Sequence, residues 1–310
     1  MMQTNNKTIY LILGALLLML CIKSSYQNGQ KKATDAQTIY AQLVAWGINV
    51  DHLAPDVPQY QIDRQIKLLG HVDSETRVAA AHWLAARGVK EATAEIATAM
   101  QDQDTFRPCQ LAHALGNLGD TTYNPLLMTL ASQTKNKDLS VCATMALGTI
   151  CAPETTNHLI TIYKQSNTSF SILTAICNIA SPTATPFLTD LLNTTQLQLH
   201  KQVSNEGLAR INILTNKNPH TKLIAHLTTQ NNIDNKLSIW HIKQLALRPS
   251  EQGATCLYDL LNNTKHHNEV AIALSAALIA HGDSGIGLLK TLSQSTNKQS
   301  QTFAEAALSL

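Results

Sequence analysis

The chain has 310 residues, of which 44% are apolar, 5% aromatic and only 14% charged, against about 25% charged residues in ordinary soluble domains. A core built from this composition must be aliphatic. Lys7 and Lys23 account for the net charge of +2, and the other 21 basic residues balance 21 acidic ones. Because this part of the chain is neutral, its charge gives no support for binding to nucleic acid or to an anionic membrane surface.

The chain begins with a predicted targeting segment, residues 1–25. Between Lys7 and Lys23 lies TIYLILGALLLMLCI, an uncharged run of 15 residues, which is short for a membrane span of about 20 residues and suits a signal sequence. Three fates remain open: an uncleaved anchor, a cleaved signal, or lipidation at Cys21, although Leu20 stands where a lipoprotein box needs a small residue. We expect a membrane-anchored or exported protein, with the side of the membrane undetermined.

Residues 26–60 form a predicted linker and capping helix. A polar stretch precedes AQTIYAQLVAWG, a short amphipathic helix. We expect Trp46 to pack this helix over the first repeat, because the terminal units of a repeat array need a polar outer surface.

Residues 61–310 consist of a repeated unit. An apolar marker residue recurs at intervals of 31, 32, 29, 32, 37, 33 and 30 residues. These markers are Leu84, Leu115, Leu147, Ile176, Leu208, Leu245, Leu278 and Leu308. Between them runs a second pattern, apolar-apolar-x-x-apolar, as in LLMTL and FLTDL, which places an apolar stripe on one face of a helix.

Helix boundary signals agree with two helices per unit. Gly119 and Gly282 close first helices, Pro153 and Pro182 open second helices, and Asp73 and Asp104 stand at N-cap positions. Runs of alternating β-branched and polar residues are missing. One such helix pair cannot bury its stripe alone, so the sequence predicts an all-α solenoid of stacked antiparallel helix pairs.

The motifs DSETRVAAAHWLAARG and CQLAHALGNLGDTTYNPLLMTLAS resemble the HEAT-like repeats of the phycobilisome-lyase type. The resemblance covers residues 61–310 and implies a HEAT/armadillo-like superhelix. The 37-residue interval departs from the pattern and predicts a kink or longer loop near residues 212–220.

The search for reactive groups predicts no catalytic residue, no cofactor and no metal site. Five cysteines follow the N-terminal segment at irregular spacing, which does not indicate a disulfide framework, so they are expected to be buried thiols. They are Cys109, Cys142, Cys151, Cys177 and Cys256. The sequence contains no HExxH, GxSxG or Walker motif.

A candidate partner-binding strip follows from the expectation that second helices line the concave face. It comprises Thr129, Ile162, Asp190, His226, Asp259 and Thr291. The strip is neutral and mixed, which favours a protein or peptide over a nucleic acid. No small-molecule substrate is indicated.

Two functional hypotheses result. The first is a non-catalytic scaffold, tethered by its N-terminal helix, that binds a partner on its concave face. The alternative is an enzyme or enzyme subunit, since the resemblance extends to lyases that attach bilins and to HEAT-like DNA glycosylases. The sequence stops in the first helix of an eighth unit, so we also expect a partner, a second copy or further chain to cover that end.

Overall fold

The computed structural model describes residues 35–48, 50, 53, 57–101, 108–133, 137–166, 169–229, 235–263 and 267–310. The expected N-terminal anchor and the expected cap Asp104 lie outside these ranges. Within them, no helix combines the length and the apolar character that a membrane crossing requires. All regular structure in the described ranges is helical, which confirms the expected all-α solenoid.

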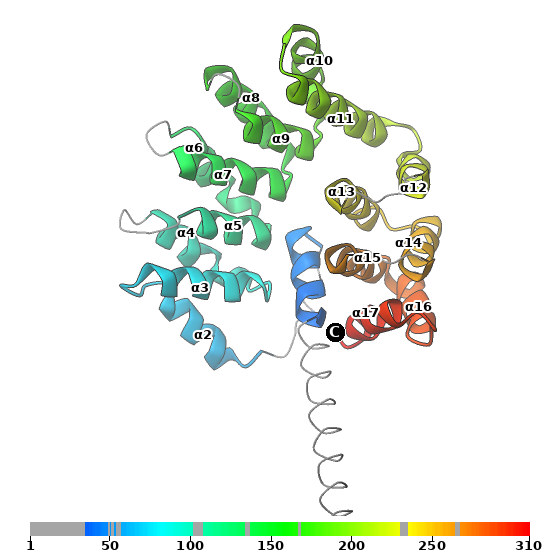
Figure 1. The fold of residues 1–310 in the computed structure, drawn as a ribbon. Helices are drawn as coiled ribbons and strands as arrows, with labels where there is room; N and C mark the ends of the chain where they lie inside the picture. Colours follow the sequence, from blue (N-terminus) through cyan, green and yellow to red (C-terminus); the bar gives the residue numbers. More distant parts are fainter. Residues whose placement is uncertain are drawn as a thin grey trace, which may run out of the picture.

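The helices form two layers around a common centre (Figure 1). The inner layer is made by the first helices of the units: α3 (Ser74–Ala85), α5 (Pro108–Leu118), α7 (Lys137–Ile150), α9 (Phe170–Ile179), α11 (Gln198–Thr215), α13 (Asn235–Ala246), α15 (Asn268–Ala280) and α17 (Lys298–Leu308). The outer layer is made by the second helices: α4 (Thr93–Gln101), α6 (Asn124–Ala131), α8 (Thr156–Gln165), α10 (Thr185–Thr194), α12 (Pro219–Thr229), α14 (Glu251–Asn263) and α16 (Gly282–Leu292). Helix α2 (Gln59–Leu68) packs on α3 and contains no buried residue.

Most of the repeat markers are fully buried in the core. Six of the eight are at most 1% exposed: Leu84, Leu115, Leu147, Ile176, Leu245 and Leu278. Leu208 is half-buried, and Leu308 at the end of α17 is 37% exposed. The periodic pattern therefore marks the core in all but two units.

The helix boundaries follow the expected local chemistry. The Asp73 carboxylate accepts hydrogen bonds from the backbone N–H groups of Glu75 and Thr76 at 3.4 and 2.9 Å. The hydrogen bond that the Thr76 hydroxyl donates to it, together with these backbone bonds, lowers its pKa. Gly119 and Gly282 adopt φ of 65° and 62° after inner helices. Such left-handed residues satisfy the last helical carbonyls and end the helix.

Neighbouring inner helices approach closely where the sequence has glycine. A Cβ atom on Gly116 of α5 would lie 3.1 Å from the Ala146 Cα, and one on Gly148 of α7 would lie 2.9 Å from the Ala175 Cα. Such distances leave no room for a side chain. Small residues at these positions therefore set the spacing of α5, α7 and α9.

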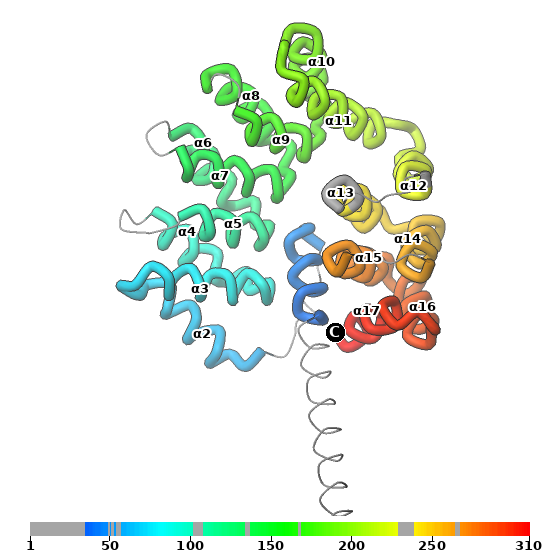
Figure 2. The backbone as a smooth tube through the Cα atoms, viewed as in Figure 1, coloured from blue at the N-terminus to red at the C-terminus, as the bar shows by residue number. Residues whose placement is uncertain are grey.

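The irregular unit differs from expectation. The extra residues do not form a longer loop: α11 runs for 18 residues to Thr215, and α12 begins at Pro219. The insertion lengthens the inner helix instead, and beyond it the array bends back toward its own beginning (Figure 2). The expected kink is therefore present as a change of direction after a long helix.

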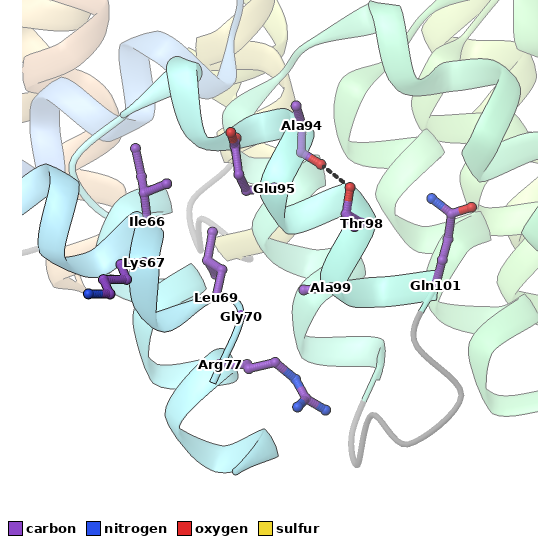
Figure 3. Close-up of a pocket in the computed structure, with 10 residues that line it drawn as sticks. All are labelled: Ile66, Lys67, Leu69, Gly70, Arg77, Ala94, Glu95, Thr98, Ala99 and Gln101. Atoms are coloured by element: carbon purple, nitrogen blue, oxygen red, sulfur yellow. Dashed lines mark hydrogen bonds between the residues drawn. The ribbon is translucent and has the colours of Figure 1, made fainter. Parts of the chain in front are cut away.

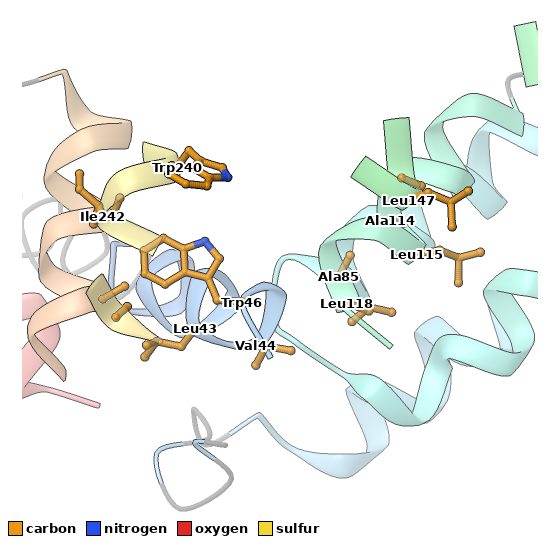
Figure 4. Packing of buried hydrophobic residues seen from close by; sticks show 14 of the residues in the cluster. Leu43, Val44, Trp46, Ala85, Ala114, Leu115, Leu118, Leu147, Trp240 and Ile242 are labelled. Atoms are coloured by element: carbon orange, nitrogen blue, oxygen red, sulfur yellow. The ribbon is translucent and has the colours of Figure 1, made fainter. Parts of the chain in front are cut away.

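The helical segment 35–45, which we call the central helix, lies at the centre of the curve rather than over the end of the array (Figure 1). Its Ile39 and Leu43 side chains are fully buried. A Cβ atom on Gly88, which follows α3, would lie 2.7 Å from the Val44 Cγ2 and 2.9 Å from the Tyr40 Cε1. On its other side Trp46 lies beside Trp240 and Ile242 of α13 (Figure 4). The central helix thus connects the beginning of the array with α13.

The expectation that all five cysteines are free thiols is wrong. Cys109 of α5 and Cys142 of α7 form a disulfide, with their Cα atoms 5.0 Å apart. The two are 33 residues apart, which is about one repeat, so they occupy nearly matching positions on adjacent helices. The match between this separation and the repeat period could have indicated the disulfide. It was overlooked because the five cysteines taken together are irregularly spaced.

Replacing Leu115 with Asp should unfold the array. The side chain is 1% exposed, and an unpaired buried carboxylate should lower the free energy of unfolding by more than about 4 kcal/mol. Urea denaturation followed by circular dichroism measures the change. Thr129→Asp, on an exposed face of α6, is the matched control and should be near neutral; equal losses would mean that the helix faces are misassigned.

The disulfide should contribute to stability. Replacing both Cys109 and Cys142 with Ser should lower the free energy of unfolding by about 3 kcal/mol, because a closed loop of this length restricts the unfolded chain. Reductant should lower the stability of the natural chain by a similar amount and leave that of the double variant unchanged. An equal effect of reductant on both proteins would contradict the assignment.

Candidate functional site

The expectation that second helices line the concave face is wrong for this array. The first helices face the centre and the second helices lie outside (Figures 1 and 2). The central helix lies on their inner side, where the Val44 and Tyr40 side chains contact Gly88 and the backbone of residues 44 and 45 contacts Gly119.

The proposed partner-binding strip therefore lies on the outer layer. Thr129, Asp190, Asp259 and Thr291 are exposed there. Ile162 is 7% exposed and belongs to the core, and His226 stacks on His241 of α13 with ring centroids 4.3 Å apart. The structure brings none of the six into the central pocket described next, and their role in partner binding stays a prediction.

A pocket of about 480 Å³ opens at the centre of the array. Its walls come from the central helix and from the inner helices α5, α7, α9, α11 and α13. The residues that matter for the argument are Trp46, Cys151, Cys177, Arg210, Trp240 and Lys243. Because its walls come from distant parts of the chain, the pocket exists only when the array has closed on itself.

Two hydrogen bonds close the array at this pocket. The Trp240 indole N–H donates to the Asn178 carbonyl at 2.9 Å, and the Lys243 ammonium donates to the Thr149 carbonyl at 3.2 Å. Both acceptors are at the C-terminal ends of inner helices, where carbonyl groups lack helical partners and carry partial negative charge. The indole of Trp240 and the ammonium of Lys243 thus hold α13 to the ends of α9 and α7.

Arg210 is the buried cation of the site. It is 7% exposed, and its Nη1 donates to the Asn178 Oδ1 at 2.6 Å and to the Cys177 carbonyl at 3.4 Å. Its guanidinium carbon lies 5.1 Å from the centroid of the Trp240 ring, within the range of a cation–π contact. Burial lowers the pKa of this group, yet an arginine stays charged at neutral pH.

The charge of Arg210 is incompletely satisfied by the described residues. Its Nε is buried without a hydrogen-bond partner. Glu206 lines the same pocket one helical turn before Arg210 on α11, and its negative charge favours the charged guanidinium. With Arg210, Lys243 and Glu206 in its walls, the pocket carries one net positive charge.

Two thiols line the pocket and differ in their exposure. Cys177 is 2% exposed, its thiol donates to the Val203 carbonyl at 3.3 Å, and burial raises its pKa to about 12. It is therefore protonated at neutral pH. Cys151 is half-buried, and its thiol donates to the Gly148 carbonyl at 3.0 Å and to the Asn178 carbonyl at 3.6 Å.

A larger hollow, of about 710 Å³, lies at the edge of the array between α2, α3 and α4 (Figure 3). Its lining includes Arg77, which donates to the His71 carbonyl at 2.7 Å, and Thr98, whose hydroxyl donates to the Ala94 carbonyl of its own helix at 2.9 Å. Beside this hollow, the α2 side chains Ile62, Ile66 and Leu68 are only partly buried against the core. The central pocket is the better candidate despite its smaller volume.

Sequence reasoning missed this site. Asn117, Thr149, Asn178 and Arg210 stand two residues after successive markers, and all four line the pocket. This shared offset from the markers could have predicted that the four residues lie on one face of the inner layer. The contribution of Trp46, from outside the repeats, had no such signal.

No protein-family model matches the chain, and no curated protein matches it. Solved structures resemble it. One is the complex of CpcE and CpcF of phycocyanin lyase from Nostoc sp. PCC7120, with 18% identity, a TM-score of 0.48, and coverage of 83% of this chain and 97% of that chain. Another is human deoxyhypusine hydroxylase in complex with glycerol, with 18% identity, a TM-score of 0.36, and coverage of 81% and 95%. The chain has the fold of a HEAT-like array, a solenoid of stacked antiparallel helix pairs.

These comparisons correct the functional expectation. A non-catalytic scaffold and a protein without enzyme character were expected, but both solved structures belong to enzymes or enzyme complexes. At this level of identity the likeness concerns the fold alone. The function of this chain must therefore be argued from its own pocket.

Replacing Leu43 with Ala should test whether the central helix belongs to the folded core. The side chain is fully buried, and such a truncation lowers the free energy of unfolding by about 2–5 kcal/mol. Chemical denaturation followed by circular dichroism would show it. Gln37→Ala, at a half-buried position of the same helix, should cost much less; a neutral Leu43→Ala would show that the central helix is a dispensable linker.

Proposed function

We propose that this chain is an enzyme, or the ligand-binding subunit of an enzyme, of the lyase type, and that its central pocket holds a small organic acid with flat conjugated rings. The observation that carries the proposal is the presence of two cations, Arg210 and Lys243, in the walls of a pocket that two indoles also line. They outnumber Glu206, the one carboxylate in the wall, so an anionic ligand would balance the remaining positive charge.

The cations favour a carboxylate. Arg210 and Lys243 are each 7% exposed and come from α11 and α13. A guanidinium and an ammonium in a region of low dielectric form strong charge-assisted hydrogen bonds to an anion. Binding such a group would also reinforce the closure between α7, α9 and α13.

The aromatic residues favour flat rings. Trp46 and Trp240 are 7% and 6% exposed, and Phe170 contributes to the same wall. Indole and phenyl faces stack on conjugated systems and supply most of the apolar contact area in ligand sites. An acid without rings would leave this surface unused.

A DNA glycosylase is the less favoured alternative. Such an enzyme needs a basic surface that tracks the phosphate backbone, and beyond Lys23 the chain has equal numbers of acidic and basic residues. The central helix also occupies the concave space in which a duplex would have to lie (Figure 1).

We also infer that the chain works outside the cytoplasm. The N-terminal apolar run supports this inference, and so does the Cys109–Cys142 disulfide, since such bonds persist mainly in oxidising compartments. Membrane anchoring and a protein partner remain further proposals. For the partner, the exposed members of the outer strip are the surface to examine.

Titration with biliverdin, a linear tetrapyrrole with two carboxylates, tests the proposed function. Binding should shift the ligand's visible absorption and quench the fluorescence of Trp46 and Trp240. The dimethyl ester, which keeps the rings and lacks the charges, should bind at least tenfold more weakly. Equal binding of acid and ester, or no binding of either, would overturn the proposal.

Matched lysine variants locate the site. Lys243→Met should weaken binding of the acid at least tenfold and leave binding of the ester unchanged, which also shows that the pocket is intact. Lys290→Met removes the same charge from an exposed position of α16 and should have no effect. Equal losses in both variants would show that the acid responds to overall charge instead of the pocket.

A further inference from the structure

Four histidines lie where helix α12 meets its neighbours. His220 and His226 belong to α12, His241 belongs to α13, and His281 directly follows α15. The rings of His226 and His241 are stacked, with their centroids 4.3 Å apart. Histidine is the side chain whose charge ordinarily changes between about pH 5 and pH 8. The junction of α12 with α13, α14 and α15 therefore contains groups that can respond to acid.

The surroundings of His281 suit the neutral ring. The side chain is 6% exposed, and its Nδ1 lies 2.7 Å from the Ala277 carbonyl oxygen. Because a carbonyl oxygen only accepts, Nδ1 carries the proton and Nε2 presents a lone pair. Nε2 is buried and has no hydrogen-bond partner among the described residues. A second proton would place a buried charge and an unsatisfied N–H group at this atom.

The first turn of α14 adds to this cost. A Cβ atom on Gly253, the third residue of α14, would lie 2.8 Å from the His281 Nε2. The ring therefore lies directly against the N-terminal turn of a 13-residue helix. This end of a helix carries partial positive charge and disfavours a cation. Protonation of His281 would thus push the ring and α14 apart.

Charged groups near His281 do not offset this cost. The titratable and charged groups on the neighbouring segments are His220 and Lys222 of α12, Arg248 after α13, Glu251 and Cys256 of α14, and Asp283 of α16. Glu251 and Asp283 are exposed. Burial lowers the pKa of His281; the hydrogen bond to Ala277 opposes this effect, and the charge of His220 adds to it.

The same junction supports the helix that closes the array. The His220 Nε2 donates to the Arg248 carbonyl at 2.5 Å, directly after the end of α13. Helix α13 carries Trp240 and Lys243, whose hydrogen bonds to the ends of α9 and α7 close the central pocket. A charge on His281 would repel His220 and displace the first turn of α14, so it would disturb both supports of α13.

We infer that His281 makes the closure of the array sensitive to acid. Protonation at Nε2 loosens the junction of α12, α14 and α15, and α13 loses part of its support. The stacked His226 and His241 rings act in the same direction, because two charged rings at their distance repel each other. The inference concerns the chain by itself and does not depend on the ligand proposed for the central pocket.

The direction of the pH dependence follows from proton linkage. The closed chain holds the pKa of His281 below its ordinary value, which is about 6.5, so the loosened state binds the proton more readily. The stabilisation is therefore complete above about pH 6.5 and decreases as the pH falls below this value.

Hydrogen–deuterium exchange of the full chain at pH 7.5 and pH 5.5, corrected for the intrinsic exchange rates, tests the inference. The opening of α14 and α15 should increase at acid pH by at least about threefold more than the opening of α5 and α7. The His281→Asn variant, whose amide can still donate toward Ala277 and cannot be charged, should lose this difference. The His267→Asn variant removes an exposed histidine before α15 and should keep it.

Two results would overturn the inference. One is an acid response of the same size in the natural chain and in His281→Asn. The other is an acid response that is equal in α5, α7, α14 and α15. If His281→Asn does not fold, NMR of the histidine ring protons in the natural chain decides: the His281 signal should titrate below about pH 6.5, and a midpoint above that value would contradict the inference.

Discussion

The close contact between successive inner helices is the constraint on which the rest of this structure depends. At Gly116 and Gly148 the backbone of one helix lies against the backbone of the next, with no room for a side chain. The outer-layer side chains of Leu127 and Leu159 are fully buried. The array curves with the first helices on the inside (Figure 1).

Curvature creates an apolar interior that the repeats cannot cover by themselves. The central helix covers it, and its buried side chains contact the ends of early inner helices on one side and α13 on the other (Figure 4). The lengthened α11 bends the array far enough for α13 to reach α7 and α9. Closure therefore needs the central helix, the long helix and the two donors of α13 together.

The candidate site is a consequence of that closure. The C-terminal ends of α7 and α9 present unsatisfied carbonyls and left-handed residues, and these attract Lys243, Trp240 and the Cys151 thiol. Arg210 is buried at the same place because α11 packs on α9 through Gly207, where a Cβ would lie 2.5 Å from the Cys177 sulfur. The ends of inner helices, which elsewhere only complete a unit, thus line the candidate site where distant units meet.

The sequence by itself determined the elements of this protein. Helix periodicity, the marker residues and the Gly119 and Gly282 helix ends depend on interactions within one unit, and these were readable from spacing alone. The tertiary structure alone decided which layer faces inward, that Cys109 pairs with Cys142, and that Trp46 meets Trp240. Those features join residues from different units or from outside the array. Their positions depend on the summed rotation from one unit to the next, and a small change per unit moves distant residues apart. The central pocket, with walls from six segments of the chain, exists only once that sum is fixed.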